Sequence, residues 1–393
     1  MRPIVIFALA VALLGPAIQA KNVTKAYGGK VYAHIMPWFE TRESSGNGQW
    51  GQHWTMANQN PDVIVDGSGR RQIASFYYPE IGPYGSGVYE TIEYQLMLMK
   101  YSGIDGVLID WPGTTNAYDY PKNKANCEAI IAGAERIGLE FAIVYEDHNI
   151  KLAGEAGFIS DWMGQAQADM GYLKDVYMPK GNYVRYNGAP LLLTFGPQTF
   201  FTPGEWSNVF APFGGNKPAF LTLWYQREQA GDNARGEYPW IYSDFYDGLR
   251  NFYNNRPLEI KFGVTYPGFR TFYANGGWGG PTFELPVGLE TFGNTLDLAI
   301  QANVPYIQIA TWNDYGEGTM VEPTREFGNG FLNILQQKQG LEFGNDELEL
   351  VKLLYKKRME YKGVRAVKSL LDEAAQHLID LKPAKASEIL RNL

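Results

Sequence analysis

The stretch VPYIQIATWNDYGEGT, residues 304–319, decides the fold of this chain. Its first seven residues, 304–310, form an apolar run that is typical of a buried strand. Two acids, Asp314 and Glu317, follow where the run ends, among aromatic rings and glycines. Continuous apolar runs are typical of parallel strands, because helices cover both faces of a parallel sheet. The stretch therefore predicts a parallel sheet that carries acids at the end of one strand.

Other short runs rich in β-branched or aromatic residues precede this one. They cover residues 31–36, 106–110, 141–145, 190–195, 220–224, 240–242 and 260–264. Segments with helical spacing lie between most of them, at 89–101, 123–137, 158–176, 244–253 and 289–302. Eight strand–helix units over about 320 residues predict a (β/α)8 TIM barrel with long βα-loop insertions, because a compact barrel needs only ~250 residues. A doubly wound open sheet is the alternative, which the lack of a GxGxxG after the first strand weakens.

The two ends of the chain differ from this central region. Residues 1–20, MRPIVIFALAVALLGPAIQA, combine a basic Arg2, an apolar stretch, a Gly-Pro breaker and a final Ala20. This pattern predicts a secretory signal peptide and a secreted or periplasmic protein. From Asn345, two segments with helical spacing on either side of Gly363 predict a C-terminal helical hairpin. We therefore expect a signal peptide at 1–20, a catalytic barrel at 21–344 and a helical hairpin at 345–393.

Composition narrows the possible functions. A formal net charge of −8 argues against non-specific nucleic-acid binding, which depends on clustered Lys and Arg. Beyond the leader, no apolar stretch is long enough to predict a membrane span. The sequence lacks HExxH, phosphate-loop and GxSxG motifs, so we expect no metal and no cofactor. Aromatic residues make up 15% of the chain, which favours an oligosaccharide or polysaccharide as partner, bound by a monomer.

The two acids after the last strand are the strongest candidates for catalysis. Positions three apart on a straight strand point to opposite faces, so Asp314 and Glu317 converge only if the chain curls. Gly316 and Gly318 flank Glu317 and permit the backbone angles of a tight turn. Hydrolysis of a glycoside needs such a pair, one acid to protonate the leaving oxygen and one carboxylate to act as base or nucleophile. The alternative interpretation is that both acids only cap the next helix and bond loop amides.

The other strand ends also carry acids and rings, and a TIM barrel builds its active site from the C-terminal ends of its strands. Asp110, Glu146 and His148 are predicted to contact substrate hydroxyls, or else to satisfy polar groups of their own loops. Aromatic rings there predict stacking on sugar faces. The predicted substrate-binding residues are Trp38, Trp54, Tyr78, Tyr84, Asp110, Trp111, Glu146, His148, Trp224, Tyr266, Trp312, Asn313 and Tyr315. A Gly-rich GGWGG around Trp278 predicts a mobile lid or plain loop packing.

At these residues the chain resembles glycoside hydrolase family 99, the endo-α-mannosidases and endo-α-1,2-mannanases. TWNDYGEGT with the following Glu322-Pro323 is similar to the family's WNEW-x-EGT-x-x-EP. HIMPWFE, GQWGQHW, FYYPEIGPYGS, YSGIDGVLIDWPG and TYPGF fall in the family's order, so the resemblance spans roughly residues 30–325. It implies an endo-acting α-glycosidase. In that family's mechanism, Asp314 would take the proton of a sugar 2-hydroxyl to form a 1,2-anhydro intermediate, and Glu317 would be acid, then base, at the leaving oxygen.

One position departs from the family's pattern. Asp314 stands where the family has Glu, which draws the carboxylate back by on the order of 1.5 Å. A displacement of ~1 Å can lower a rate ~100-fold. WNDYGE is also similar to the α-1,3-glucanases of glycoside hydrolase family 71, so an inverting hydrolase of that kind is the alternative. A second alternative is a non-catalytic carbohydrate-binding barrel in which this change has disabled turnover.

Overall fold

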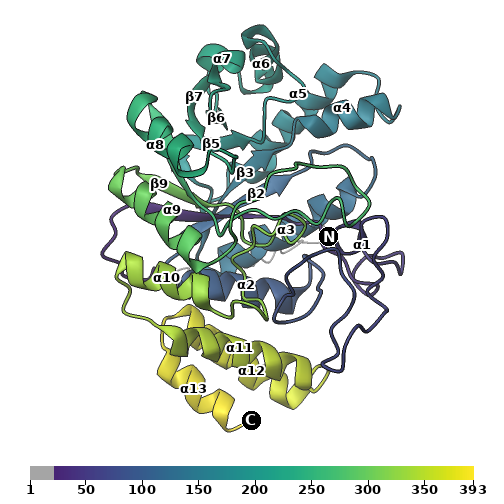
Figure 1. Cartoon of the computed structure of the whole chain (residues 1–393), viewed down its shortest axis with the longest axis vertical. Coiled ribbons are helices and arrows are strands. Elements are labelled where there is room, and N and C mark those ends of the chain that lie inside the picture. Colours follow the sequence, from purple (N-terminus) through teal and green to yellow (C-terminus); the bar gives the residue numbers. More distant parts are fainter. Residues whose placement is uncertain (1–21) are drawn as a thin grey trace, which may run out of the picture.

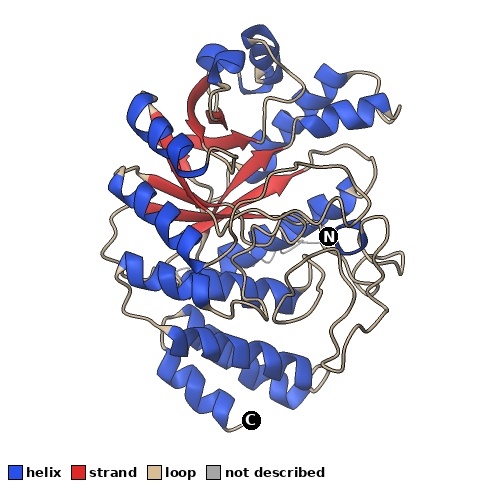
Figure 2. Cartoon of the chain, viewed as in Figure 1, coloured by secondary structure: helices blue, strands red, loops and turns tan. Residues whose placement is uncertain are grey.

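The computed structural model describes residues 22–393, and its centre is a closed barrel of parallel strands (Figure 1, Figure 2). The barrel strands pair in chain order, with β3 next to β5 and β9 next to β1. The short strand β4 (Arg185–Tyr186) forms an antiparallel hairpin with β5 and is not part of the barrel. The predicted (β/α)8 barrel is therefore confirmed. The barrel strands are β1 Lys30–Ile35, β2 Gly106–Trp111, β3 Glu140–Tyr145, β5 Ala189–Thr194, β6 Ala219–Leu223, β7 Ala234–Tyr238, β8 Ile260–Thr265 and β9 Tyr306–Ile309.

Helices surround the strands, as Figure 2 shows. Their bounds are α1 Gln52–Thr55, α2 Tyr89–Tyr101, α3 Tyr120–Ile137, α4 His148–Glu155, α5 Trp162–Tyr172, α6 Pro203–Val209, α7 Arg227–Ala230, α8 Phe245–Asn255, α9 Leu289–Gln301 and α10 Gly330–Gln339. Within residues 22–393, every helix is too short or too polar to cross a membrane.

Alternation along each strand decides which side chains reach the interior of the barrel. Trp111 and Tyr145 are neighbours in the β2–β3 register, and both point outward, because Trp111 packs on Tyr172 and the Tyr145 hydroxyl donates to Asp169, both residues of α5. Successive side chains of a strand face opposite ways. Asp110, which precedes Trp111, therefore points inward at the carboxyl end of β2, and Glu146 takes the same direction just after β3.

Strand β7 lies earlier in the chain than the sequence predicts. The predicted strand was 240–242, but the structure forms it at Ala234–Tyr238, with the sequence ARGEY. Two charged residues interrupt the apolar pattern of this segment. Glu237 is fully buried and accepts from the guanidinium of Arg256 at 2.6 Å, so an ion pair on the helix side replaces the apolar contact that a pattern search looks for.

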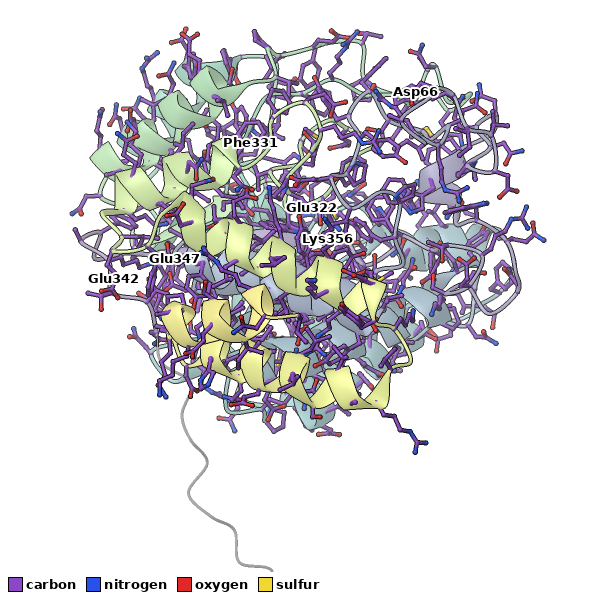
Figure 3. All side chains as sticks on the ribbon, turned by 90° about the horizontal axis from the view of Figure 1, so that it is seen from below. Asp66, Glu322, Phe331, Glu342, Glu347 and Lys356 are labelled. Atoms are coloured by element: carbon purple, nitrogen blue, oxygen red, sulfur yellow. The ribbon has the colours of Figure 1, made fainter. Side chains whose placement is uncertain are left out.

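The C-terminal region has three helices where two were predicted. They are α11 Asn345–Glu360, α12 Arg365–Ile379 and α13 Pro383–Arg391, and they lie beside α2 and α10 at the foot of Figure 1. Figure 3 shows α11 across this face, with Glu347 near its start and Lys356 further along. The prediction of a hairpin missed α13. Its separation from the barrel as a domain stays a prediction, and the predicted signal peptide lies outside the described residues.

Three long loops meet at the carboxyl end of the barrel. Residues 36–88 follow β1, residues 266–288 follow β8 and residues 310–329 follow β9. Backbone hydrogen bonds join them in pairs, from Ala57 to Gly276 at 2.9 Å, from Arg270 to Glu317 at 2.9 Å and from Glu80 to Pro323 at 2.9 Å. The loops therefore brace one another around the end of β9.

Candidate active site

The chain curls directly after β9, as the two glycines predict. The amide of Thr311 donates to the carbonyl of Thr319 at 2.8 Å, which closes residues 311–319 into a loop. Gly318 has φ +67°, a left-handed conformation that favours glycine, and a side chain there would meet the Arg270 carbonyl oxygen. Inside this loop the Glu317 amide donates to Asp314 Oδ1 at 3.1 Å. Asp314 thus bonds a loop amide, as the alternative interpretation expects, and the bond fixes the Asp314 carboxylate against the backbone of Glu317.

Tyr273 holds the second acid from the neighbouring loop. Its hydroxyl donates to Glu317 Oε1 at 3.2 Å. The position of Tyr273 is fixed by backbone pairing, because Phe272 donates to the Gly316 carbonyl at 2.8 Å. Sequence reasoning missed Tyr273, since only the contact between two loops far apart in the chain brings it to the site. The Trp278 amide donates to the Tyr273 carbonyl at 2.7 Å, which favours loop packing over a lid for the GGWGG segment.

Asp110 and Glu146 complete a group of four acids that we call the carboxyl cluster: Asp110, Glu146, Asp314 and Glu317. Asp110 and Asp314 are 5% and 4% exposed, and the other two are half-buried. Burial raises the pKa of Asp110 and of Asp314 to about 7. Burial and the charge of Asp314 raise the pKa of Glu317 to about 8. Burial and the neighbouring Asp110 raise the pKa of Glu146 well above its usual value, because two close carboxyl groups in a buried site disfavour a second negative charge.

These raised pKa values predict that the carboxyl cluster destabilises the protein at neutral and higher pH. A carboxyl group that titrates near pH 4 in the unfolded chain and near 7 when folded contributes stability at low pH, which is lost as the pH rises through about 7. We expect Asp314→Asn to raise the free energy of unfolding at pH 8 by up to ~4 kcal/mol, the equivalent of three pKa units. The gain should shrink toward zero at pH 4. Urea unfolding at pH 4, 6 and 8 measures it.

Asp175→Asn is the matched control for this prediction, because the Asp175 side chain is 69% exposed. Its substitution should leave the free energy of unfolding unchanged at each pH. A variant Asp314→Asn that is less stable than the natural protein at pH 8 would contradict the expected destabilising role of the buried carboxylate.

A further buried acid, Glu322, holds the loop after β9 in place. Its Oε2 accepts from the hydroxyls of Tyr84 at 2.8 Å and Tyr315 at 2.9 Å, and its Oε1 accepts from Gln95 of α2 at 2.7 Å. Burial raises the pKa of Glu322 to about 7 despite these donors. Glu322 is fully buried, and Figure 3 labels it near the middle of the view. Tyr84 and Tyr315, predicted to bind substrate, therefore hold the loop in place instead.

Asn313 has a similar structural role. Its side chain accepts from the Met36 amide at 2.8 Å and donates to the Met36 carbonyl at 3.0 Å. These two bonds tie the loop after β9 to the end of β1. Because both ends of the amide are occupied, the predicted contact between Asn313 and substrate is replaced by a contact that aligns two strands.

Most of the predicted stacking rings are buried, so their contact with sugar stays a prediction that this burial does not favour. Trp54, Tyr78, Trp111, Tyr266 and Trp312 are each at most 2% exposed. Trp111 points away from the barrel interior, and Trp224, which is half-buried, packs on Phe252 of α8 at 5.9 Å. Only alternate side chains at a strand end point toward the barrel interior. The sequence alone does not show whether an aromatic residue there faces the interior or the surrounding helices.

The rings with exposed surface come mainly from the loops. Trp38 is half-buried and stacks on His53 with centroids 4.1 Å apart, and Trp278 meets the same His53 edge-on at 5.9 Å. His148, also half-buried, begins α4 directly after the acids of β3. Trp240, which was not predicted as a site residue, packs against His34 at 4.9 Å beneath the cluster. Loops far apart in the chain thus supply the aromatic surface near the acids.

Comparison with known proteins agrees with this architecture, although no protein-family model matches the chain. The sequence is 21% identical over 298 residues to the glycoprotein endo-alpha-1,2-mannosidase of Xenopus laevis, an alignment that covers 69% of this chain and 63% of that protein. It is 22% identical over 280 residues to the glycoprotein endo-alpha-1,2-mannosidase-like protein of Danio rerio, an alignment that covers 64% of this chain and 60% of that protein. The chain thus spans less than two thirds of the length of these curated relatives.

Solved structures match over more of the chain. The GH99 endo-alpha-mannosidase from Bacteroides thetaiotaomicron aligns with a TM-score of 0.58 at 17% identity, covering 82% of this chain and 98% of that one. The structure of that enzyme in complex with BIS-TRIS-Propane gives a TM-score of 0.60, covering 84% and 99%. The chain therefore shares its fold with the GH99 endo-alpha-mannosidase, and the resemblance to glycoside hydrolase family 99 that its motifs predict is confirmed.

Proposed function

We propose that this protein is an endo-acting α-glycoside hydrolase that cleaves an α-mannan-type glycan, with Asp314 and Glu317 as its catalytic pair. The observation that carries the proposal is the curled loop 311–319. It follows β9 at the carboxyl end of the barrel, the Glu317 amide lies 3.1 Å from Asp314 Oδ1, and the charge of Asp314 raises the pKa of Glu317, which supports a pair that acts on one sugar. Acids at this end of a TIM barrel are the usual catalytic groups of the fold. The predicted signal peptide would place the activity outside the cytoplasm.

The pKa values assign different roles to the two acids. Glu317, with a pKa of about 8, holds a proton at neutral pH and donates it to the glycosidic oxygen as the bond to C1 breaks. Asp314, with a pKa of about 7, is the more acidic member of the pair and accepts the proton of the sugar 2-hydroxyl. The freed oxygen then attacks C1 and forms the 1,2-anhydro sugar.

The second half of the reaction reverses these proton transfers. Glu317, now a carboxylate, takes a proton from water, and the resulting hydroxide opens the anhydro ring at C1. Asp314 returns its proton to O2, so both acids regain their starting states. The Tyr273 hydroxyl donates to Glu317 Oε1 at 3.2 Å in the resting enzyme, which fixes the direction of that carboxyl group before substrate arrives.

The remaining acids of the cluster suit substrate binding. Asp110 and Glu146 follow from β2 and β3 at the same end of the barrel as the catalytic pair, and Asp110 raises the pKa of Glu146. A carboxyl group accepts hydrogen bonds when it is ionised and also donates one when it is protonated, so both acids can bind sugar hydroxyls. We assign them to the sugar that lies next to the cleaved bond.

A release assay tests the proposal. The purified protein is incubated with yeast α-mannans, α-1,3-glucan and sulfated marine glycans, and new reducing ends are measured. We expect release from α-mannan, with NMR of the first product giving its anomeric configuration. Release from α-1,3-glucan alone, with inversion, would support the family 71-like alternative. Binding of a glycan without release would support the non-catalytic alternative.

A further inference from the structure

Two exposed aromatic rings, on the segments that follow β2 and β3, have no part in the proposed mechanism. Tyr118 is 58% exposed and Phe158 is 52% exposed. Their ring centroids lie 5.1 Å apart at an interplanar angle of 61°, an edge-to-face pair. Single exposed rings are common on protein surfaces, but contiguous exposed apolar groups often mark a binding site.

This pair, which we call the Tyr118–Phe158 pair, rests on a firm base. Ala117, Tyr120 and Ala153 form a small buried cluster below it, and the Tyr120 ring contacts the Tyr118 ring at 5.5 Å. The Phe158 amide donates to the Ala153 carbonyl at 2.9 Å. Tyr118 has φ +49°, a left-handed conformation that its surroundings must hold. The ring pair is therefore presented in a fixed arrangement.

The pair lies on the two segments that follow the strands carrying Asp110 and Glu146. Tyr118 lies in the loop after β2 and Phe158 lies beyond α4, which follows β3, the two strands that carry Asp110 and Glu146. Asp119, next to Tyr118, contacts the loop after β1 that carries Trp38 and His53. Polar groups border the pair, since Gln52 donates to Asp119 at 3.1 Å.

We propose that the Tyr118–Phe158 pair is a distal subsite that stacks on a hexopyranose ring of the glycan, beyond the sugars that flank the cleaved bond. The inference rests on the proposed function and deepens it, because a distal subsite selects an extended chain over a disaccharide. Rings with adjacent amide and carboxylate groups match the apolar face and hydroxyl edge of a sugar. Two side chains cover far less than the ~800 Å² per partner of a stable protein interface, which disfavours a protein as occupant.

Binding without turnover tests this subsite. In the full chain carrying Glu317→Gln, calorimetry measures affinity for α-manno-oligosaccharides of increasing length and for polymeric α-mannan. We expect affinity to rise with length. Adding Tyr118→Ala or Phe158→Ala should lower the affinity for the longest ligands roughly tenfold, the scale of one lost aromatic contact, and leave the disaccharide unchanged. Tyr118→Phe should restore the natural affinity, which separates loss of the ring from loss of folding.

Phe201→Ala is the matched control, because Phe201 is 53% exposed and lies in the loop after β5. It should bind every ligand as the parent does. The subsite is wrong if Tyr118→Ala keeps the full dependence on length, or if Phe201→Ala loses as much affinity. The proposed function has its own test, and it is wrong if the natural protein releases no reducing ends from any α-mannan. The calorimetric test of the subsite then uses the glycan from which the release assay does detect new reducing ends.

Discussion

Glu317→Gln is expected to lower kcat on the natural glycan by about 100- to 10,000-fold, the usual contribution of a positioned general acid. Gln keeps the size of the side chain and can still accept from Tyr273, which lies 3.2 Å from Oε1 in the natural protein. It cannot give a proton to the leaving oxygen. Substrate affinity should stay within a fewfold, because the change removes a proton transfer and not a binding group. Steady-state kinetics and calorimetry on the same preparation measure both quantities.

A substrate with an activated leaving group separates the two catalytic roles. A dinitrophenyl glycoside leaves without protonation, so Glu317→Gln should retain much of the rate of the first step on this substrate, whereas Asp314→Asn should not. Glu284→Gln is the control, since Glu284 lies in the same loop as Tyr273 and its side chain is 64% exposed. Glu317 would not be the general acid if Glu317→Gln kept full activity on the polymer, or if it lowered kcat by the same factor on the polymer and on the dinitrophenyl glycoside.

The sequence predicts the barrel and the acid pair because both depend on local signals. Apolar runs identify most strands, and glycines at 316 and 318 indicate that the chain turns enough to bring Asp314 to Glu317. The direction of a ring at a strand end is a different matter. Asp110 and Trp111 are adjacent, so only one can face the interior, and the pattern alone does not say which.

Contacts between distant segments account for most of what the sequence does not predict. Tyr273 reaches Glu317 only because Arg270 and Phe272 pair with the loop after β9. The sequence pattern does not reveal strand β7, because the charged Glu237 interrupts its apolar run. In the folded chain Arg256, which follows α8, pairs with Glu237 at 2.6 Å. Both features depend on partners supplied by the folded chain, and neither leaves a periodic pattern in its own segment.

Truncation after Gly344 is expected to prevent the barrel from folding. The sequence predicts a domain boundary there, because alternating strand and helix patterns give way to helical spacing alone. Lys100 at the end of α2 is 3% exposed, and its ammonium donates to the carbonyls of Ile137 at 2.7 Å and Ile379 at 2.9 Å. These carbonyls end α3 and α12, so one cation joins the barrel to the C-terminal helices. Without α12, a buried charge loses half of its partners, which is strongly destabilising.

Two further contacts add to this loss. The Tyr101 hydroxyl donates to the Leu378 carbonyl at 2.9 Å, and Arg358 of α11 pairs with Glu93, a residue of α2 that is 2% exposed. The truncation also uncovers apolar side chains at ~1.5–3 kcal/mol each. The sum approaches the ~5–15 kcal/mol by which a domain is usually stable. We therefore expect little soluble protein and no cooperative thermal transition by circular dichroism.

Truncation after Lys382 is the matched control. It removes α13 but keeps the contacts of Lys100, Tyr101 and Arg358, so it should leave a cooperative, less stable protein. A soluble fragment that ends at Gly344 and melts cooperatively would instead establish the barrel as an independent domain. In that case the contacts of Lys100, Tyr101 and Arg358 with the C-terminal helices and α2 contribute little to the free energy of unfolding, and Gly344 marks the boundary between two domains.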